Sequence, residues 1–431
     1  MKVFIYTLGC KVNEVDSELY AQEMRLLGAE TTTALTEADA VIVNSCSVTN
    51  RAQAQSLQFA RRAVRERPGA PVYLTGCGAA LLNLTRTGAP VGVTVVAMSD
   101  RAEVARLVVG SGDAGQTAAR WVDGCIQRAG ARNRVDVRVQ EGCDNMCTYC
   151  VVPFVRGSRL ESKPVDVAVG EVMRLATTGV KEVVLTGTEI GKYGEAPERL
   201  SVLLDSMLRA LETAGLPTRV RVSSLNPDAI TEALVSQFAN HAQLCPQLHL
   251  PLQSGSDAVL QRMRRPYRSN DLLDSVGCLR AVDSSFALTT DVIVGFPGET
   301  EQDLQATLDV IRLAEFAKVH VFPYSPRPFT PAAREEHQVP AEVVKERLHR
   351  MFDVAEQTGM TFARRFIGQQ VTIISEKCSP GEVEGYSEYY LWTEGRVSEN
   401  KMLERDSFVV VRVECCHFDG DRVVLFGSVV P

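Results

Sequence analysis

Short apolar runs alternate with amphipathic stretches over the first 110 residues. Three of the runs have the length and composition of buried strands: residues 2–8, 40–44 and 71–75. Residues 18–27 carry apolar side chains at helical spacing, and residues 51–67 form a second helical pattern that ends at Pro68 and Gly69. Apolar strands that alternate with helices are typical of a parallel sheet covered on both faces. The pattern predicts an α/β, flavodoxin-like domain over residues 1–110.

The alternation returns after a glycine- and alanine-rich stretch at 111–134, which we interpret as a linker. Six further strands are predicted: residues 135–140, 182–186, 219–223, 247–250, 287–294 and 318–322. Helical patterns separate several of these strands, at 165–177, 200–213 and 301–316, and a long amphipathic helix follows at 342–366. The order predicts a (βα)6 partial TIM-type barrel over residues 135–366, because an eight-stranded barrel would need roughly 250 residues.

The tail, residues 367–431, changes character. It contains the segments VTIISE, DSFVVVRVE and RVVLFGSVV, which are rich in valine and separated by turn residues. Short strands joined by turns predict a small C-terminal β-barrel. The tail is also acidic, with 6 Lys and Arg against 11 Asp and Glu.

Composition limits which cellular compartment and which partners we expect for the chain. Of the 431 residues, 45% are hydrophobic and 23% charged, as in ordinary globular proteins. No signal-like segment or membrane-length apolar run stands out, so we expect a cytoplasmic monomer without a membrane partner. With a net charge of −7, any basic surface for a nucleic acid must be local. The 12 cysteines in a reducing compartment favour metal ligands or catalysis over disulfides.

Cys143, Cys147 and Cys150 form a CxxxCxxC cluster directly after the strand predicted at 135–140. A zinc knuckle and three core thiols are the alternatives, but zinc sites usually take four ligands in paired spacings and no second pair is near. Three thiolates on one loop can bind three irons of a [4Fe-4S] cluster and leave the fourth iron open. The loop at the end of a barrel strand is also where such folds carry their chemistry. The spacing therefore predicts a catalytic iron–sulfur site.

Cys10, Cys46 and Cys77 share one context, because each follows the end of a predicted strand in the first domain. The carboxyl ends of parallel strands lie along one edge of a sheet, so these cysteines are expected to converge. Gly9 and Gly76 allow close backbone approach there. Small cysteines also pack at strand ends without a function, yet three matching positions favour a second three-thiolate [4Fe-4S] site. The other six show no ligand spacing and are predicted to be structural: Cys125, Cys245, Cys278, Cys378, Cys415 and Cys416.

The spacing at Cys143–Cys150 resembles that of radical-SAM enzymes, which cleave S-adenosylmethionine (SAM) at a [4Fe-4S] cluster. Tyr149 matches the family's aromatic residue before the last cysteine. The segment LTGTE at 185–189 resembles the one that binds the SAM amino group, and DVIVGFPGE at 291–299 resembles the one that packs against the adenine. The resemblance implies cofactor contacts from ten residues: Tyr149, Thr186, Gly187, Glu189, Ser223, Gln253, Asp291, Ile293, Gly295 and Glu299.

Nearly the whole chain resembles methylthiotransferases, which combine a three-cysteine N-terminal domain, a radical-SAM barrel and a C-terminal TRAM-like domain. Further matching segments are HLPLQSG at 249–255, PYSP at 323–326 and TTDVIVGFPGET at 289–300. TLGCKVN at 7–13 and NSCSVT at 44–49 resemble the branch that acts on N6-threonylcarbamoyladenosine in tRNA. The isopentenyladenosine branch more often has Gln-Met-Asn after its first cysteine, and the ribosomal-protein branch has Pro-Lys-Asn.

The resemblance implies a 2-methylthio transfer to N6-threonylcarbamoyladenosine at tRNA position 37, next to the anticodon. Carbon 2 of adenine is not nucleophilic, so a cofactor-derived radical suits this step and the protein supplies placement. The implied partners are tRNA, an electron donor of the flavodoxin or ferredoxin type, and a sulfur donor. Two alternatives remain open: methylthiolation of isopentenyladenosine or of a ribosomal protein side chain, and a non-enzymatic role as a two-cluster electron carrier or redox sensor.

A basic run lies between residues 262 and 268 and contains no acidic residue. Such a run is often a solvated loop, but four arginines beside an aromatic residue are also suited to an unpaired RNA base. We therefore predict RNA contacts from five residues: Arg262, Arg264, Arg265, Tyr267 and Arg268.

Overall fold

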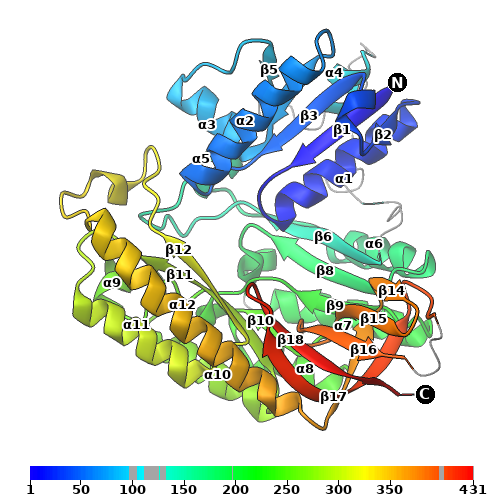
Figure 1. Cartoon of the computed structure of the whole chain (residues 1–431), viewed down its shortest axis with the longest axis vertical. Helices are drawn as coiled ribbons and strands as arrows, with labels where there is room; N and C mark the ends of the chain where they lie inside the picture. The colour runs from blue at the N-terminus through cyan, green and yellow to red at the C-terminus, as the bar shows by residue number, and fades with distance from the viewer. Residues whose placement is uncertain (97–103, 111–125, 127–132, 197, 398–401, 431) are drawn as a thin grey trace.

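The computed structural model describes residues 1–96, 104–110, 126, 133–196, 198–397 and 402–430. Within this part of the chain, a parallel sheet with helices is followed by a curved set of parallel strands and then by a C-terminal sheet (Figure 1). Cys125 and almost all of the predicted linker at 111–134 lie outside the described residues.

The N-terminal sheet is entirely parallel and has the strand order β2-β1-β3-β4-β5. Its strands are β1 (Lys2–Thr7), β2 (Glu30–Thr32), β3 (Ala40–Ser45), β4 (Val72–Thr75) and β5 (Val93–Val95). Side chains alternate along β3, so that Ile42 packs under α1 (Lys11–Leu26) and α4 (Val104–Val109), and Val43 packs under α2 (Asn50–Glu66) and α3 (Gly76–Thr85). Both faces are therefore covered, and the order is that of flavodoxin-like folds, as predicted.

Six parallel strands form the second unit of the described chain. They are β6 (Arg134–Glu141), β8 (Glu182–Gly187), β9 (Arg219–Val222), β10 (Gln247–His249), β11 (Ala287–Val294) and β12 (Lys318–Pro323). Parallel ladders join β6-β8-β9 and β10-β11-β12, and single bridges from Val220 to Leu244 and from Ser224 to His249 connect the two ladders. The short strand β7 (Glu161–Ser162) pairs antiparallel with β6. The predicted (βα)6 partial barrel is thus confirmed, because the six strands are parallel and joined in chain order.

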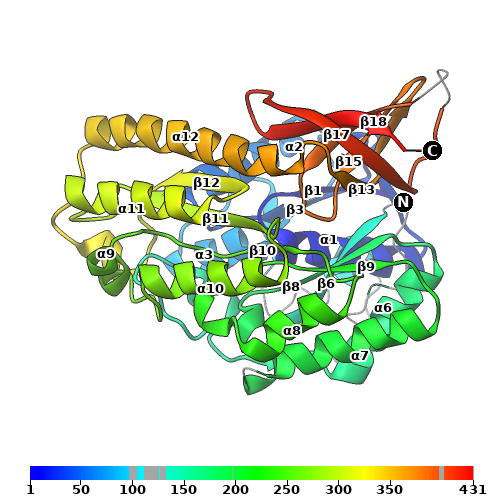
Figure 2. The same ribbon diagram turned by 90° about the horizontal axis from the view of Figure 1, so that it is seen from below.

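Helices cover the outer side of these strands (Figure 2). They are α6 (Val165–Thr177), α7 (Arg199–Thr213), α8 (Glu232–Asn240), α9 (Asp257–Arg262), α10 (Ser269–Val282) and α11 (Glu301–Ala314). Leucines at helical spacing along α7, including Leu204, Leu208 and Leu211, are completely buried in the barrel core. The covering helices therefore leave the carboxyl ends of the strands to the loops that carry the site.

The long helix α12 (Ala341–Ala363) connects the barrel to a six-stranded C-terminal sheet. The strands are β13 (Gln370–Ile374), β14 (Lys377–Ser379), β15 (Glu382–Tyr386), β16 (Trp392–Arg396), β17 (Phe408–Phe418) and β18 (Val423–Val429), in the order β13-β17-β18-β16-β15-β14. An antiparallel bridge from Ile373 to Ser387 joins β13 to the end of β15, so the sheet curls back on itself as a small barrel would. Phe362 and Phe366 at the end of α12 are completely buried in its core.

No helix in the described ranges combines the length and the apolar composition that crossing a bilayer requires.

Candidate active site

The loop that follows β6 carries Cys143, Cys147 and Cys150. It begins at Gly142, whose φ is +86°, and a Cβ at this position would stand 1.9 Å from the carbonyl oxygen of Arg159. Only glycine therefore fits before the first cysteine. Thr148 anchors the middle of the loop, because its hydroxyl donates to the carbonyl of Arg262 at 2.9 Å and its amide donates to that of Met263 at 3.1 Å.

The three cysteines of this loop are close enough for the charge of one to shift the pKa of another. Burial, together with the charge of Cys147, raises the pKa of Cys150 to about 12 and that of Cys143 to about 11. The Cys147 sulfur accepts a hydrogen bond from Arg265 Nη1 at 3.2 Å. Buried thiols of this kind need a nearby cation to ionise, and iron supplies one. The donor set fits an iron–sulfur cluster.

The described residues contain no group of three or more His, Cys, Asp or Glu side chains arranged to bind a single metal ion. A four-iron cluster has a different requirement, because each cysteine binds its own iron at a separate corner. Its ligands therefore stand farther apart than the ligands of one ion.

Glu189 follows β8 at the same end of the barrel as the cysteine loop. Its Oε2 accepts hydrogen bonds from Asn145 at 2.7 Å and Asn226 at 2.9 Å, while Oε1 has no recorded partner among the described residues. Burial raises the pKa of Glu189 to about 7. Asn145 lies inside the cysteine loop, so the carboxylate is tied directly to it. Thr186 and Gly187 end β8 beside this group, and Gly187 packs against Gln140.

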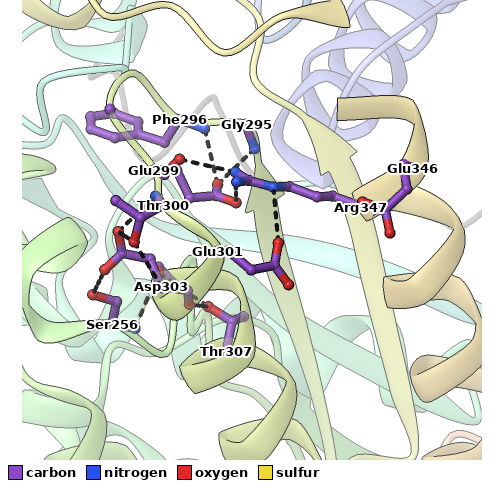
Figure 3. A network of polar contacts seen from close by, with 12 residues as sticks. Ser256, Gly295, Phe296, Glu299, Thr300, Glu301, Asp303, Thr307, Glu346 and Arg347 are labelled. Carbon is purple, nitrogen blue, oxygen red and sulfur yellow. Dashed lines mark hydrogen bonds and ion pairs between the residues drawn. The ribbon is translucent and has the colours of Figure 1, made fainter. Parts of the chain in front are cut away.

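Glu299 has a different place from the one expected of a residue that touches SAM. Its Oε2 accepts the backbone amides of Gly295 at 2.7 Å and Phe296 at 3.2 Å, and its Oε1 accepts Arg347 Nη1 at 3.0 Å (Figure 3). Gly295 has a φ of +79°. Both carboxylate oxygens are thus occupied in holding the turn after β11, so Glu299 shapes the wall of the site while the backbone of that turn faces it.

The helix after this turn is fixed by the same stretch of sequence. Thr300 accepts the amide of Asp303 at 3.2 Å and Asp303 accepts the amide of Thr300 at 2.8 Å, which is a reciprocal cap for α11 (Figure 3). The turn and the helix therefore start from fixed positions.

Five further predicted residues remain: four lie in or after strands of the barrel and one lies in the cysteine loop, namely Ser223, Gln253, Asp291, Ile293 and Tyr149. Gln253 has a φ of +63° and pairs through its backbone with Asp291 and Ile293, at 2.8 and 2.9 Å. Burial would raise the pKa of Asp291, but hydrogen bonding and the charge of His249, 3.3 Å away, lower it overall. Ser223 directly follows β9, and its backbone joins Leu185 to His249. Tyr149 packs with Ile293 and Phe296.

Cys10, Cys46 and Cys77 converge at the carboxyl edge of the N-terminal sheet. Ser45 at the end of β3 and Gly76 at the start of α3 are bridged, and the next residues in the chain are Cys46 and Cys77. Burial raises the pKa of both thiols, that of Cys77 to about 11, and the charge of Cys10 adds to the shift of each. The Cys46 sulfur accepts the Val48 amide at 3.4 Å. Three sulfur atoms with amide and guanidinium donors form a second donor set that fits an iron–sulfur cluster.

Cys77 of the N-terminal trio contacts the helix that follows the barrel cysteine loop. Cys77 packs with Val151 and Val155, which directly follow the barrel cysteine loop. Arg156, the last residue of α5 (Val152–Arg156), donates from Nε to the Cys77 sulfur at 3.0 Å. The edge of the N-terminal sheet therefore faces the open end of the barrel.

Sequence reasoning missed several polar residues of this site. Asn13, a member of the segment at 7–13, donates to the carbonyls of Leu8 and Ser45 at 2.8 and 3.1 Å, and so fixes the edge that bears the cysteines. Arg156 was detectable only as a basic residue six positions after Cys150.

The predicted RNA contacts need correction. Tyr267 is 2% exposed and its hydroxyl donates to the Pro251 carbonyl, so its ring is not available for stacking on a base. Arg262 donates to the Pro297 carbonyl at 2.7 Å, and Arg265 donates to the Cys147 sulfur. The sequence did not indicate these contacts, because the arginines donate to carbonyls, a side-chain amide and a thiol rather than to carboxylates. Of the five, Arg264 and Arg268 are exposed.

Fold and site together define a radical-SAM type of enzyme. Residues 137–311 match the model of the radical SAM superfamily, and residues 2–90 match that of the uncharacterized protein family UPF0004. The threonylcarbamoyladenosine tRNA methylthiotransferase MtaB of Thermotoga maritima is 35% identical over 97% of both chains. A tRNA-2-methylthio-N(6)-dimethylallyladenosine synthase of Corynebacterium glutamicum is 36% identical over 86% of this chain and 74% of its own.

Among solved structures, the radical SAM methyltransferase TsrM from Kitasatospora setae, with cobalamin and a 4Fe-4S cluster bound, has a TM-score of 0.57 at 18% identity and covers 77% of both chains. That likeness concerns the fold. The full-length relatives carry the assignment: the chain belongs to the radical-SAM methylthiotransferase family. An enzyme of this family uses SAM and a [4Fe-4S] cluster, for which the barrel loop offers Cys143, Cys147 and Cys150.

We expect SAM binding to weaken as the pH falls below 7. The pKa of Glu189 is raised to about 7, so most of the carboxylate is protonated on going from pH 8 to pH 6, and the carboxylate is a stronger acceptor than the neutral acid for the N–H groups of the SAM amine. If Glu189 receives the SAM amino group, the dissociation constant rises about tenfold over this range. Calorimetric titration of reconstituted protein measures it and should also record proton release at pH 6.5. The Glu189→Gln variant should bind more weakly with a flat profile, and a flat profile in the wild type would contradict the assignment.

Proposed function

We propose that this enzyme methylthiolates carbon 2 of N6-threonylcarbamoyladenosine at position 37 of tRNA, with two [4Fe-4S] clusters. The observation that carries the proposal is the packing of Cys77, a member of the N-terminal trio, against α5, which directly follows the cysteine loop of the barrel. A methylthio transfer needs a radical source and a sulfur-bearing group near one substrate atom, and two adjacent clusters meet that need. When bound, the clusters and SAM supply the radical and the transferred sulfur and methyl group.

The chain's own residues bind and orient these groups. Cys143, Cys147 and Cys150 would hold the cluster in the barrel, with Glu189 toward the SAM amino group and the Glu299-braced turn toward its adenine. Cys10, Cys46 and Cys77 would hold the second cluster. An external electron donor of the flavodoxin or ferredoxin type and a sulfur donor remain predictions, as do a cytoplasmic location and a TRAM-like role for the C-terminal sheet.

Lys11, next to Cys10, favours the threonylcarbamoyl substrate over an apolar one. Its Nζ lies 5.9 Å from the Tyr390 ring centroid and, within the described part of the chain, no carboxylate lies within 4 Å of it. Burial lowers the pKa of Lys11, while Asp136 and Glu182 attract the ammonium and Arg221 and Arg134 repel it. The threonylcarbamoyl group carries a carboxylate, and the dimethylallyl group carries no charge. A cation on the residue next to Cys10 can therefore pair with the first substrate and gains nothing from the second.

The Lys11→Met variant should lose about 10- to 100-fold in kcat/KM on an anticodon stem-loop bearing threonylcarbamoyladenosine, because a substrate carboxylate would be left unpaired. On the same stem-loop with the carboxylate replaced by a carboxamide, wild type and variant should be equally slow. Mass spectrometry of the methylthio nucleoside gives both rates. Lys345→Met, at an exposed position of α12, serves as the control. Equal losses on the two substrates would exclude pairing with the carboxylate.

The proposed function itself is tested by nucleoside analysis of tRNA from a deletion strain. We expect the methylthio form of threonylcarbamoyladenosine to disappear and to return when the gene is restored. An unchanged profile would refute the proposal, and loss of a methylthio isopentenyl nucleoside instead would reassign the substrate. Anaerobically reconstituted protein should contain about eight iron and eight sulfide per chain. A content of about four iron and four sulfide would contradict the proposal of a second cluster.

A further inference from the structure

Arg156 makes more contacts than a simple ion pair between two domains requires. It ends α5, six residues after Cys150, and its side chain is 2% exposed. Nη2 donates to Asn13 Oδ1 at 2.6 Å and to Asp16 Oδ2 at 2.8 Å, and Nη1 lies 3.4 Å from Glu141 Oε1. These contacts fix the plane of the guanidinium and leave Nε to donate to the Cys77 sulfur.

The carboxylates around Arg156 also contact a second arginine. Arg138 joins the same network, 2.6 Å from Asp16 Oδ1 and 4.0 Å from Glu141 Oε2, and all four charged side chains are at most 5% exposed. Two arginines thus face two carboxylates. A thiolate at Cys77 would place a negative charge directly on the Nε donor of Arg156.

We propose that Arg156 is a positioning residue for the N-terminal cluster, donating a hydrogen bond to the Cys77 thiolate and thereby stabilising the cluster's reduced state. This inference rests on the proposed second cluster and goes beyond it. Hydrogen bonds to ligand sulfurs and nearby positive charge raise the reduction potential of iron–sulfur clusters, because the reduced form carries more negative charge. Since Arg156 belongs to the barrel and Cys77 to the N-terminal domain, the barrel sets the potential of a cluster held by its neighbour.

The test is a redox titration monitored by electron paramagnetic resonance on the full-length, cluster-loaded chain. Signals are assigned with a Cys143→Ala, Cys147→Ala, Cys150→Ala variant, which should retain about four iron in the N-terminal cluster. In this background Arg156→Gln should shift the midpoint potential to a more negative value. Arg156→Lys, which keeps the charge but loses the fixed Nε donor, should shift it less.

Arg138→Gln is the matched control, because Arg138 contacts the same two carboxylates, Asp16 and Glu141, whereas the donor to the Cys77 sulfur is Arg156. A purely structural network would make both glutamine variants less stable and move the two potentials alike. The proposal is overturned if Arg156→Gln leaves the potential unchanged or if Arg138→Gln shifts it equally. If the triple-alanine protein with Arg156 intact holds no iron, the proposed second cluster fails, and this role for Arg156 fails with it.

Discussion

Replacing Cys147 with alanine should abolish SAM cleavage, whereas replacing Cys46 with alanine should leave cleavage and abolish methylthio transfer. Cys147 is buried in the barrel loop beside Cys143 and Cys150, where an open cluster corner would bind SAM. Cys46 belongs to the trio at the sheet edge, which the proposal assigns to sulfur delivery. The two variants should therefore separate the radical step from the sulfur step. Chromatography measures 5′-deoxyadenosine, and mass spectrometry measures the methylthio nucleoside.

Cys278→Ala supplies the control for cysteine loss. Cys278 lies on α10, is exposed, and belongs to neither trio. Both products should form at the wild-type rate in this variant. If Cys46→Ala protein still produced the methylthio nucleoside, the early trio would have no part in sulfur transfer.

The architecture was predictable because a short, continuous apolar run marks each strand in the sequence. The run at 40–44 is apolar throughout and becomes β3, which is buried over its whole length between two layers of helices. Continuous apolar runs separated by amphipathic ones leave few alternatives to a covered parallel sheet. Convergence of Cys10, Cys46 and Cys77 followed from that topology alone, since parallel strands end at one edge. The sequence did not reveal how the N-terminal sheet sits against the barrel.

The site was less predictable where long side chains change partners. Arg265 and Tyr267 look like surface groups in a basic run, yet both face inward, toward the Cys147 sulfur and the Pro251 carbonyl. An arginine reaches several ångströms from its backbone, so its partner depends on tertiary packing rather than on neighbours in the chain. Glu299 was recognised as important, but its contacts with the turn amides and Arg347 become visible only in three dimensions.

A similar limit applies to the floor of the barrel, where charged residues join it to the C-terminal sheet. Arg134, Glu182 and Arg219 begin three adjacent strands and are paired in register across them. Glu182 accepts Arg134 Nε at 2.7 Å, Arg219 Nε at 2.6 Å and Arg221 Nη2 at 2.9 Å. The strand pattern located Glu182 and Arg219 at strand starts. It could not specify the register that brings them together.

These arginines extend into the C-terminal sheet. Arg219 donates to the carbonyls of Thr372 and Tyr386 at 2.9 and 3.0 Å, and Arg221 donates to that of Glu388 at 2.9 Å. Glu182 is completely buried, so it supplies the negative charge around which three cations are arranged. Its loss would leave the cations facing one another and loosen the attachment of the C-terminal sheet to the barrel.

Glu182→Gln should therefore destabilise the protein by about 3–5 kcal/mol, because the change keeps the side-chain size and strands buried arginines without their counter-charge. Urea unfolding followed by circular dichroism measures the loss. Burial would raise the pKa of Glu182, but Arg221, Arg134 and Arg219 lower it well below its usual value. The carboxylate's contribution is thus present above the usual glutamate pKa and is lost only as the pH falls through the lowered one. The variant should remain the less stable protein at pH 4.5, whereas Glu66→Ala, which breaks an exposed pair with Arg62, should unfold like wild type. Wild-type stability in Glu182→Gln would mean that the three arginines need no counter-charge at this position.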